Sequence, residues 1–262
     1  MKGFIKGVLV TIIVLAVIIV LGLGYLGFIP GVSSIFGADK PRDLGVTYTA
    51  ADGDNAIKKS GRQITVLPSN LPPADSLKYS GQKAVDVSLT QAEFNAYIND
   101  KWEYYPVTGV QVKISPDGTV EASGILRIDR FHGLADALQV PQDVRDKVKD
   151  YIKVIPGNPA FYVKGKAEVI NGQITTLDFP EVQIGKFTIP QSGLPGLNQN
   201  SMFGELTLPQ STLRALKQST IDAIYWFFGR IPGFSVKSFN FNGGKVNFNG
   251  TLPATKAYSP AG

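Results

Sequence analysis

Cysteine is absent from this chain of 262 residues. Its absence excludes disulfide bonds, lipid attachment through a cysteine and thiolate chemistry. The folded part must therefore be stabilised by an ordinary hydrophobic core. Hydrophobic residues make up 44% of the chain, which is enough for one sizeable core or two small ones.

Histidine is almost absent, since His132 is the only one. A Ser-His-Asp arrangement would depend on it, and no GxSxG, HExxH or phosphate-loop motif accompanies it. Carboxylate pairs such as Asp52 and Asp54 are commoner in turns than in acid-base catalysis, which needs burial to separate their pKa values. The sequence therefore predicts a protein that is not an enzyme, with no catalytic residue and no cofactor.

One arrangement would suit a metal ion. Asp129, His132 and Asp136 are spaced by three and four residues, which places all three on one face of a helix. Gly133 weakens such a helix, and a histidine beside acids is more often simply solvated. We expect no metal.

Charge is missing from residues 7–29, a run of 23 positions. As a helix rising ~1.5 Å per residue, this run is long enough to cross a bilayer. Lys2 and Lys6 precede it, so the positive-inside rule places the N-terminus in the cytoplasm. We expect a single-pass cell-membrane protein whose main domain is extracytoplasmic. The alternative is a cleaved signal peptide ending near residues 31–33, but the run exceeds the roughly 7 to 15 residues of a signal core.

A strong excess of charge of one sign is also lacking. Two of the 26 basic residues precede the apolar run, which leaves 24 against 21 acidic ones. Nucleic-acid binders have a marked basic excess, so we predict no nucleic-acid partner. The pI of 9.2 indicates at most modest attraction to anionic envelope polymers or lipid headgroups.

The chain divides into four segments. Residues 1–30 form a cytoplasmic tip and membrane anchor, and residues 31–86 form an extracytoplasmic stalk, rich in turns, with one short helix and one short strand. Residues 87–255 form the regular domain, and residues 256–262 form a flexible tail.

The regular domain contains helices and hairpins. Helices are predicted after Thr90, which with Glu93 makes a capping box, over Gln142 to Ile155, and before Gly229. Hairpins are predicted over residues 110–126, 161–184 and 235–252. The second turns at Asn171-Gly172, a pair that favours type I′ turns, and Pro180 marks a bulge or an edge in it. The prediction is an α+β fold in which a hairpin-rich antiparallel sheet wraps around one long helix.

The first and last hairpins align at a constant offset of 126 residues. Val120 then matches Val246, and Gly124 matches Gly250. An internal duplication would produce this match, and so would the common use of helix followed by hairpin as a unit. Both explanations stay open.

The helix before Gly229 has an apolar surface wider than a one-sided helix needs. A curved sheet around a solid core would explain this width. The other explanation is a groove or tunnel for acyl chains, because ligand sites are mostly apolar concavities. The candidate groove residues are Leu213, Leu216, Ile224, Tyr225, Phe227 and Phe228.

The segments LTQAEFNAYIND, FYVKGKAEVINGQITTLDFPEVQIGKFTIP and SVKSFNFNGGKVNFNG support a resemblance. Over roughly Val87 to Leu252 the chain resembles bacterial membrane-anchored extracytoplasmic proteins of the YpmS type and, more distantly, the TULIP-like lipid-binding domains. The resemblance implies a helix held in a curved antiparallel sheet, an envelope location and, in some members, lipid binding. It implies no catalytic or ligand residue, because the matching positions are caps, turns and core residues.

We therefore expect a membrane-anchored extracytoplasmic protein that binds lipid or another apolar envelope molecule. The alternative is a non-catalytic interaction or structural module of the cell envelope, which contacts other envelope proteins and holds no small ligand.

Overall fold

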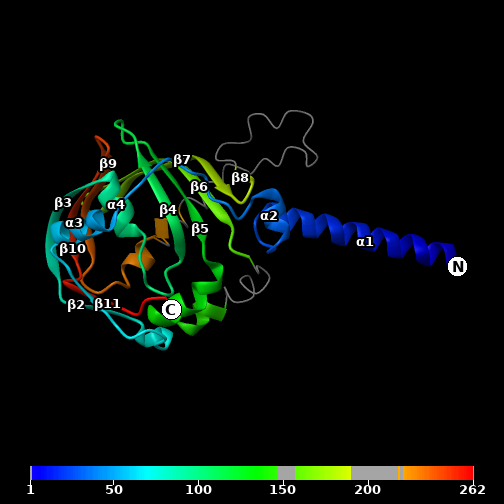
Figure 1. The fold of residues 1–262 in the computed structure, drawn as a ribbon, viewed down its shortest axis with the longest axis horizontal. Coiled ribbons are helices and arrows are strands. Elements are labelled where there is room, and N and C mark those ends of the chain that lie inside the picture. The colour runs from blue at the N-terminus through cyan, green and yellow to red at the C-terminus, as the bar shows by residue number, and fades with distance from the viewer. Residues whose placement is uncertain (1, 147–156, 190–217, 219–220, 223, 262) are drawn as a thin grey trace.

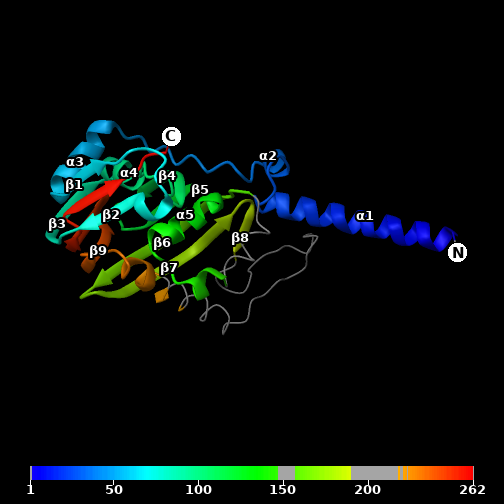
Figure 2. The same cartoon turned by 90° about the horizontal axis from the view of Figure 1, so that it is seen from below.

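The structure is a computed structural model that describes residues 2–146, 157–189, 218, 221–222 and 224–261, with side chains from Val14 onward except that of Ile189. It is an α+β fold built around a curled antiparallel sheet (Figure 1). The predicted fold class is confirmed at this level. A second, smaller sheet and a few helices complete the body of the molecule (Figure 2).

The chain begins with helix α1 (Lys2–Tyr25), which projects from the body, and α2 (Val32–Phe36) follows it (Figure 1). The C-terminal end of α1 is fixed to the body, because the backbone N–H of Lys186 donates to the carbonyl of Tyr25 at 3.0 Å. The ring of Tyr25 also packs edge-on against Phe36. Within the part of the chain that the structure describes, no helix is long and apolar enough to span a membrane.

The main sheet follows the order β3-β10-β9-β6-β5-β4, and β7 pairs with both β6 and β8. All of its pairings are antiparallel. Its strands are β3 (Lys83–Thr90), β4 (Val107–Ile114), β5 (Val120–Leu126), β6 (Ala160–Ile170), β7 (Gln173–Ile184), β8 (Phe187–Ile189), β9 (Ser235–Asn242) and β10 (Lys245–Leu252). The sheet curls into a half-barrel, and β3 and β4 are the two ends of the strand order (Figure 1).

The three predicted hairpins are all present. Asn171 and Gly172 both have positive φ, 51° and 78°, as the type I′ turn between β6 and β7 requires. Of the two positions predicted for Pro180, a bulge or an edge, the structure shows a bulge, because the register shifts between Lys164–Glu181 and Lys166–Asp178 and leaves Pro180 out of the ladder.

The first and last hairpins meet turn to turn, since the N–H of Gly243 donates to the carbonyl of Pro116 at 3.2 Å. The equivalent residues Val120 and Val246 lie in one hydrophobic cluster. Its other buried members are Val110, Val112 and Ile114, with Phe94, Ile98, Phe161, Phe239 and Phe241 packed around them. Both explanations of the 126-residue match stay open, and residues of both hairpins contribute to this core.

Helix α4 (Gln91–Ile98) packs against β3, β4 and β10, and so connects the two ends of the curled sheet. Its predicted capping box is confirmed: Thr90 Oγ1 accepts from the N–H of Glu93, and Glu93 Oε2 accepts from the N–H of Thr90. Phe94 and Ile98 point into the core. The helix therefore closes the opening of the half-barrel.

The smaller sheet has the order β1-β11-β2. Strand β1 (Gln63–Val66) runs parallel to β11 (Thr255–Tyr258), and β2 (Leu77–Ser80) runs antiparallel to β11. Helix α3 (Ala50–Ser60) precedes β1, the short 3-10 helix η1 (Pro73–Asp75) precedes β2, and α3 packs against α4. Segments of the predicted stalk thus pair with the predicted tail.

This pairing differs from the predicted domain limits. The tail was expected to be flexible from residue 256, yet Lys256 is buried within the central strand and Ser259 is fully buried. The physical reason is that these four-residue strands gain their stability from partners 175 to 192 residues away, which local patterns do not reveal. Likewise β3 begins at Lys83 rather than at Val87, because its first residues pair with the end of β10.

The remaining helices are short. The 3-10 helix η2 (Ile128–Arg130) leads into α5 (Phe131–Ala137), where Gly133 lies so close to the ring of Tyr104 that an added Cβ would overlap it. Residues 142–146 are helical, and the rest of the predicted helix to Ile155 lies outside the described residues. Residues 224–228 are helical and end at Gly229, as predicted.

Candidate functional site

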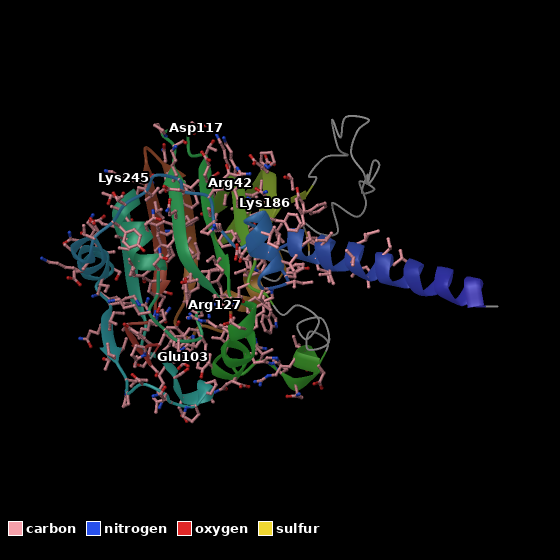
Figure 3. The ribbon with its side chains drawn as sticks, turned by 45° about the vertical axis from the view of Figure 1, so that its right-hand side comes forward. Arg42, Glu103, Asp117, Arg127, Lys186 and Lys245 are labelled. Carbon is pink, nitrogen blue, oxygen red and sulfur yellow. The ribbon has the colours of Figure 1, made fainter. Side chains whose placement is uncertain are left out.

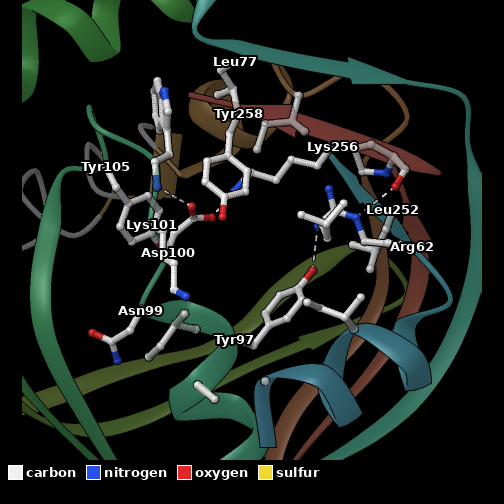
Figure 4. Close-up of a pocket in the computed structure, with 18 of the residues that line it drawn as sticks. Arg62, Leu77, Tyr97, Asn99, Asp100, Lys101, Tyr105, Leu252, Lys256 and Tyr258 are labelled. Atoms are coloured by element: carbon white, nitrogen blue, oxygen red, sulfur yellow. Dashed lines mark hydrogen bonds and ion pairs between the residues drawn. The ribbon is translucent and has the colours of Figure 1, made fainter. Parts of the chain in front are cut away.

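A cavity of about 730 Å³ lies between the smaller sheet, helices α3, α4 and α5, and the segment 227–234. One part of its wall is apolar and includes Leu77, Leu134, Leu138, Phe227, Phe228 and Ile231. Another part is polar and includes Arg62, Tyr79, Tyr97, Asp100, Tyr105, Lys256 and Tyr258 (Figure 4). The cavity is therefore amphipathic.

Local structure places Arg62 at the polar end. Helix α3 starts with a capping box between Thr49 and Asp52 and ends at Gly61, which adopts a left-handed conformation with φ of 63°. Arg62 follows directly and leads into β1. The reversal at Gly61 thus turns the chain so that the guanidinium lies beside α4 (Figure 4).

Arg62 makes two side-chain hydrogen bonds, and both acceptors are neutral. Its Nη1 donates to the hydroxyl of Tyr97 at 2.7 Å, and its Nε donates to the carbonyl of Pro253 at 3.0 Å (Figure 4). Its Nη2 is buried and has no acceptor among the described residues. The charge of Arg62 is therefore held in place by polar groups without being neutralised by them.

Lys256 and Asp100 form a buried ion pair beside Arg62. Burial lowers the pKa of Lys256, an effect that the neighbouring Asp100 carboxylate opposes and Arg62 reinforces. The second oxygen of Asp100 accepts from the N–H of Trp102 at 2.9 Å. Both charges of this pair thus have partners inside the protein, unlike that of Arg62.

Four tyrosines line the polar end together with these charges. Burial raises the pKa of Tyr79 and that of Tyr105, and the nearby Asp100 adds to both shifts. Burial also raises the pKa of Tyr258. These hydroxyls therefore stay protonated at ordinary pH and can donate or accept hydrogen bonds.

The structure brings some of the sequence-predicted groove residues to this cavity. Phe227 and Phe228 line it, and Phe228 stacks on Phe234 at 4.8 Å between ring centroids. Ile224 and Tyr225 are not among its lining residues, and the Tyr225 hydroxyl instead accepts from the N–H of Ile174 at 2.9 Å. Leu213 and Leu216 lie outside the described residues.

The residues weighed as a metal site have other partners. Asp129 accepts two hydrogen bonds from the guanidinium of Arg127, at 2.9 and 2.6 Å, and Asp136 pairs with Arg145. His132 lies on α5 with Asp136. No group of three or more histidine or acidic side chains in the described ranges is arranged to hold a metal ion.

Sequence reasoning missed the polar end of the cavity. Arg62 lies in the predicted stalk and Lys256 in the predicted tail, two segments for which the sequence predicts no site. Tyr97 follows Phe94 by three residues on α4, yet it lines the cavity while Phe94 packs in the core. The available signal was weak: two short segments, Leu77–Ser80 and Thr255–Tyr258, each carry a tyrosine and a lysine, and only in the second are they two residues apart, as on one face of a strand.

The fold and the site thus define an α+β protein with a curled antiparallel sheet and an amphipathic cavity at one side. Comparison of the chain with protein-family models, curated proteins and solved structures gives no match.

Proposed function

We propose that this protein binds an amphipathic, lipid-sized molecule in the cavity beside the smaller sheet. The observation that carries the proposal is the cavity itself, because about 730 Å³ lies within the roughly 300 to 1,000 Å³ typical of small-molecule sites. Its wall joins aromatic and aliphatic side chains to a few fixed polar groups, which is the usual composition of such sites.

The proposal includes a non-catalytic protein, anchored by one membrane span with an extracytoplasmic domain. The uncharged run 7–29 supports the span, because at ~1.5 Å per residue it matches a bilayer core. The run largely coincides with α1, which extends away from the body (Figure 1). Arg42 and Lys186 lie near α2, where the body would face anionic headgroups (Figure 3). The YpmS-type and TULIP-like resemblance supports the same function.

Photocrosslinking of the full chain in nanodiscs of neutral lipid tests the binding function. With a diazirine analogue of palmitate, we expect peptides containing Phe227 to Phe234 to be labelled saturably. The variant Ile231→Trp fills the cavity with an indole ring and should reduce this labelling about tenfold, which corresponds to losing about 1.4 kcal/mol of binding free energy. The control is Val66→Trp, which adds the same ring at a position that is 61% exposed.

Labelling that is absent, or equal in Ile231→Trp and Val66→Trp, would contradict ligand binding in this cavity. The alternative of an interaction module without a small ligand would then be the better description.

A further inference from the structure

The charge of Arg62 has no counter-ion among the described residues. Its three guanidinium nitrogens meet one tyrosine hydroxyl, one backbone carbonyl and, at Nη2, no acceptor within the described part of the chain. Leaving a buried charged donor without a partner costs free energy, and a buried charge is normally paired. The site therefore holds an uncompensated positive charge and an unused donor in the same place.

The buried cation at this end, Lys256, cannot serve the same purpose. The ammonium of Lys256 is already paired with Asp100 and lies over the ring of Tyr258, 5.1 Å from its centroid. The Lys256–Asp100 pair is therefore neutral as a unit. Arg62 alone supplies the net charge that an incoming molecule would meet among these three groups.

The surroundings of Arg62 suit an anionic group at the polar end of the cavity, whereas the opposite part of the wall suits an apolar group. The hydroxyl of Tyr97 and the carbonyl of Pro253 hold two of its nitrogens and so fix the guanidinium plane. Away from it, the cavity wall includes the apolar side chains of Phe227, Phe228 and Ile231. A molecule that satisfies both ends must carry its negative charge at one extremity.

We propose that the ligand is an anionic amphiphile whose carboxylate or phosphate head group is bound by the Nη2 of Arg62, and whose apolar tail lies against Phe227, Phe228 and Ile231. This inference rests on the proposed function and names the class of ligand. A charge-assisted hydrogen bond from a guanidinium is roughly twice as strong as one between neutral groups, so the head group decides selectivity.

The test compares two probes that differ only in the head group. Diazirine analogues of palmitate and of hexadecanol are titrated separately into nanodiscs that contain the full chain, and labelling of the peptides around Phe227 to Phe234 gives an apparent affinity for each. We expect the carboxylate to bind at least about tenfold more tightly than the alcohol. Because every sample uses the same nanodiscs, partitioning into lipid cancels when the ratio is compared between variants.

Arg62→Gln should abolish the preference for the carboxylate and leave labelling by the alcohol unchanged. Lys113→Gln is the matched control, since it removes one positive charge from an exposed position on β4, away from the cavity, and should keep the wild-type ratio. Should Arg62→Gln fail to fold, Arg62→Lys keeps the charge without the fork of donors and should retain a reduced preference for the carboxylate.

The outcomes separate the two proposals. Equal binding of both probes by the wild type, or an unchanged ratio in Arg62→Gln, overturns the anionic head group and leaves the binding function standing. If neither probe labels the protein saturably, both proposals are overturned. Acetate and inorganic phosphate serve as competitors, and if either is bound at this site without any labelling by the long-chain probes, the site holds a free anion and the amphiphile is overturned.

Discussion

At the scale of single residues, the most informative polar side chain outside the cavity is Asn95. It is fully buried, its amide group donates to the carbonyl of Val112 at 2.7 Å, and its oxygen accepts from the N–H of the same residue at 2.7 Å. Strand β4 is an edge strand, so these backbone groups have no neighbouring strand to pair with. Asn95 replaces the missing strand at this point.

Asn95→Ala should therefore be strongly destabilising. The substitution leaves a buried N–H and a buried carbonyl of Val112 without partners, and we expect it to lower the free energy of unfolding by about 3 kcal/mol. Urea unfolding of the full chain at constant detergent concentration measures the change. Asn55→Ala, at an exposed position of α3, is the control and should change stability by less than about 0.5 kcal/mol. Similar effects of the two variants would show that Asn95 does not pair the edge of β4.

The role of Asn95 could have been suspected from the sequence only in part. Gln91, Asn95 and Asn99 follow one another at intervals of four, so they form a polar stripe on one helical face. Such a stripe is usually solvated. The structure shows instead that all three bond to the backbone of β4, because the curled sheet brings that edge against the helix.

At the scale of elements, the start of α4 is stabilised by a local capping box and by an ion pair with a different helix. The capping box between Thr90 and Glu93 was predictable because its partners are three residues apart. The ion pair between Glu93 and Lys59 of α3, at 2.7 Å, was not, because it depends on how two helices pack. Burial raises the pKa of Glu93, but bonds from Lys59 and Thr90 outweigh it, and the net pKa is lowered.

The lowered pKa of Glu93 predicts a pH-dependent contribution to stability. A carboxyl group with a depressed pKa in the folded state stabilises the protein above its unfolded pKa, and this contribution is lost as pH falls through the folded value. The free energy of unfolding of the wild type should exceed that of Glu93→Gln by about 1 kcal/mol at pH 7. This difference should shrink below about pH 4.5. Glutamine keeps the capping geometry, so the comparison isolates the charge.

Urea unfolding between pH 3 and pH 7 measures this difference. Asp86→Asn, which removes an exposed carboxylate from the adjacent β3, controls for the change in net charge. A difference between wild type and Glu93→Gln that stays constant over this range would contradict the role given to the Glu93 charge.

The hairpins and the smaller sheet show why elements differ in predictability. In the hairpin of β6 and β7, neighbouring residues specify the turn, the alternation of apolar and polar side chains, and the bulge. The structure has the turn at Asn171-Gly172 and the bulge at Pro180. Strand β11 has no such signal. It is short and pairs with β1 and β2, so its existence depends on segments that only the complete fold brings together.

At the scale of the whole molecule, the cavity results from joining segments that are distant in sequence. Its polar end combines Arg62 from the start of β1, Tyr97 and Asp100 from α4 and the residues after it, and Lys256 from β11. The apolar end was partly predictable, because Phe227 and Phe228 belong to the predicted helix whose apolar surface is unusually wide. The polar end was not, since Arg62, Asp100 and Lys256 lie far apart in the chain.

Removal of residues 255–262 tests whether the last segment is structural. If these residues formed a flexible tail, their loss would change nothing. Because β11 is the central strand of its sheet, we expect β1 and β2 to lose their protection from hydrogen exchange, while β4 and β5, which pair independently of β11, keep theirs. The cavity would lose Lys256 and Tyr258 together, so labelling by the palmitate probe should fall as well. Unchanged exchange in β1 and β2 would show that the smaller sheet does not depend on β11, and the polar wall of the cavity would then need another support.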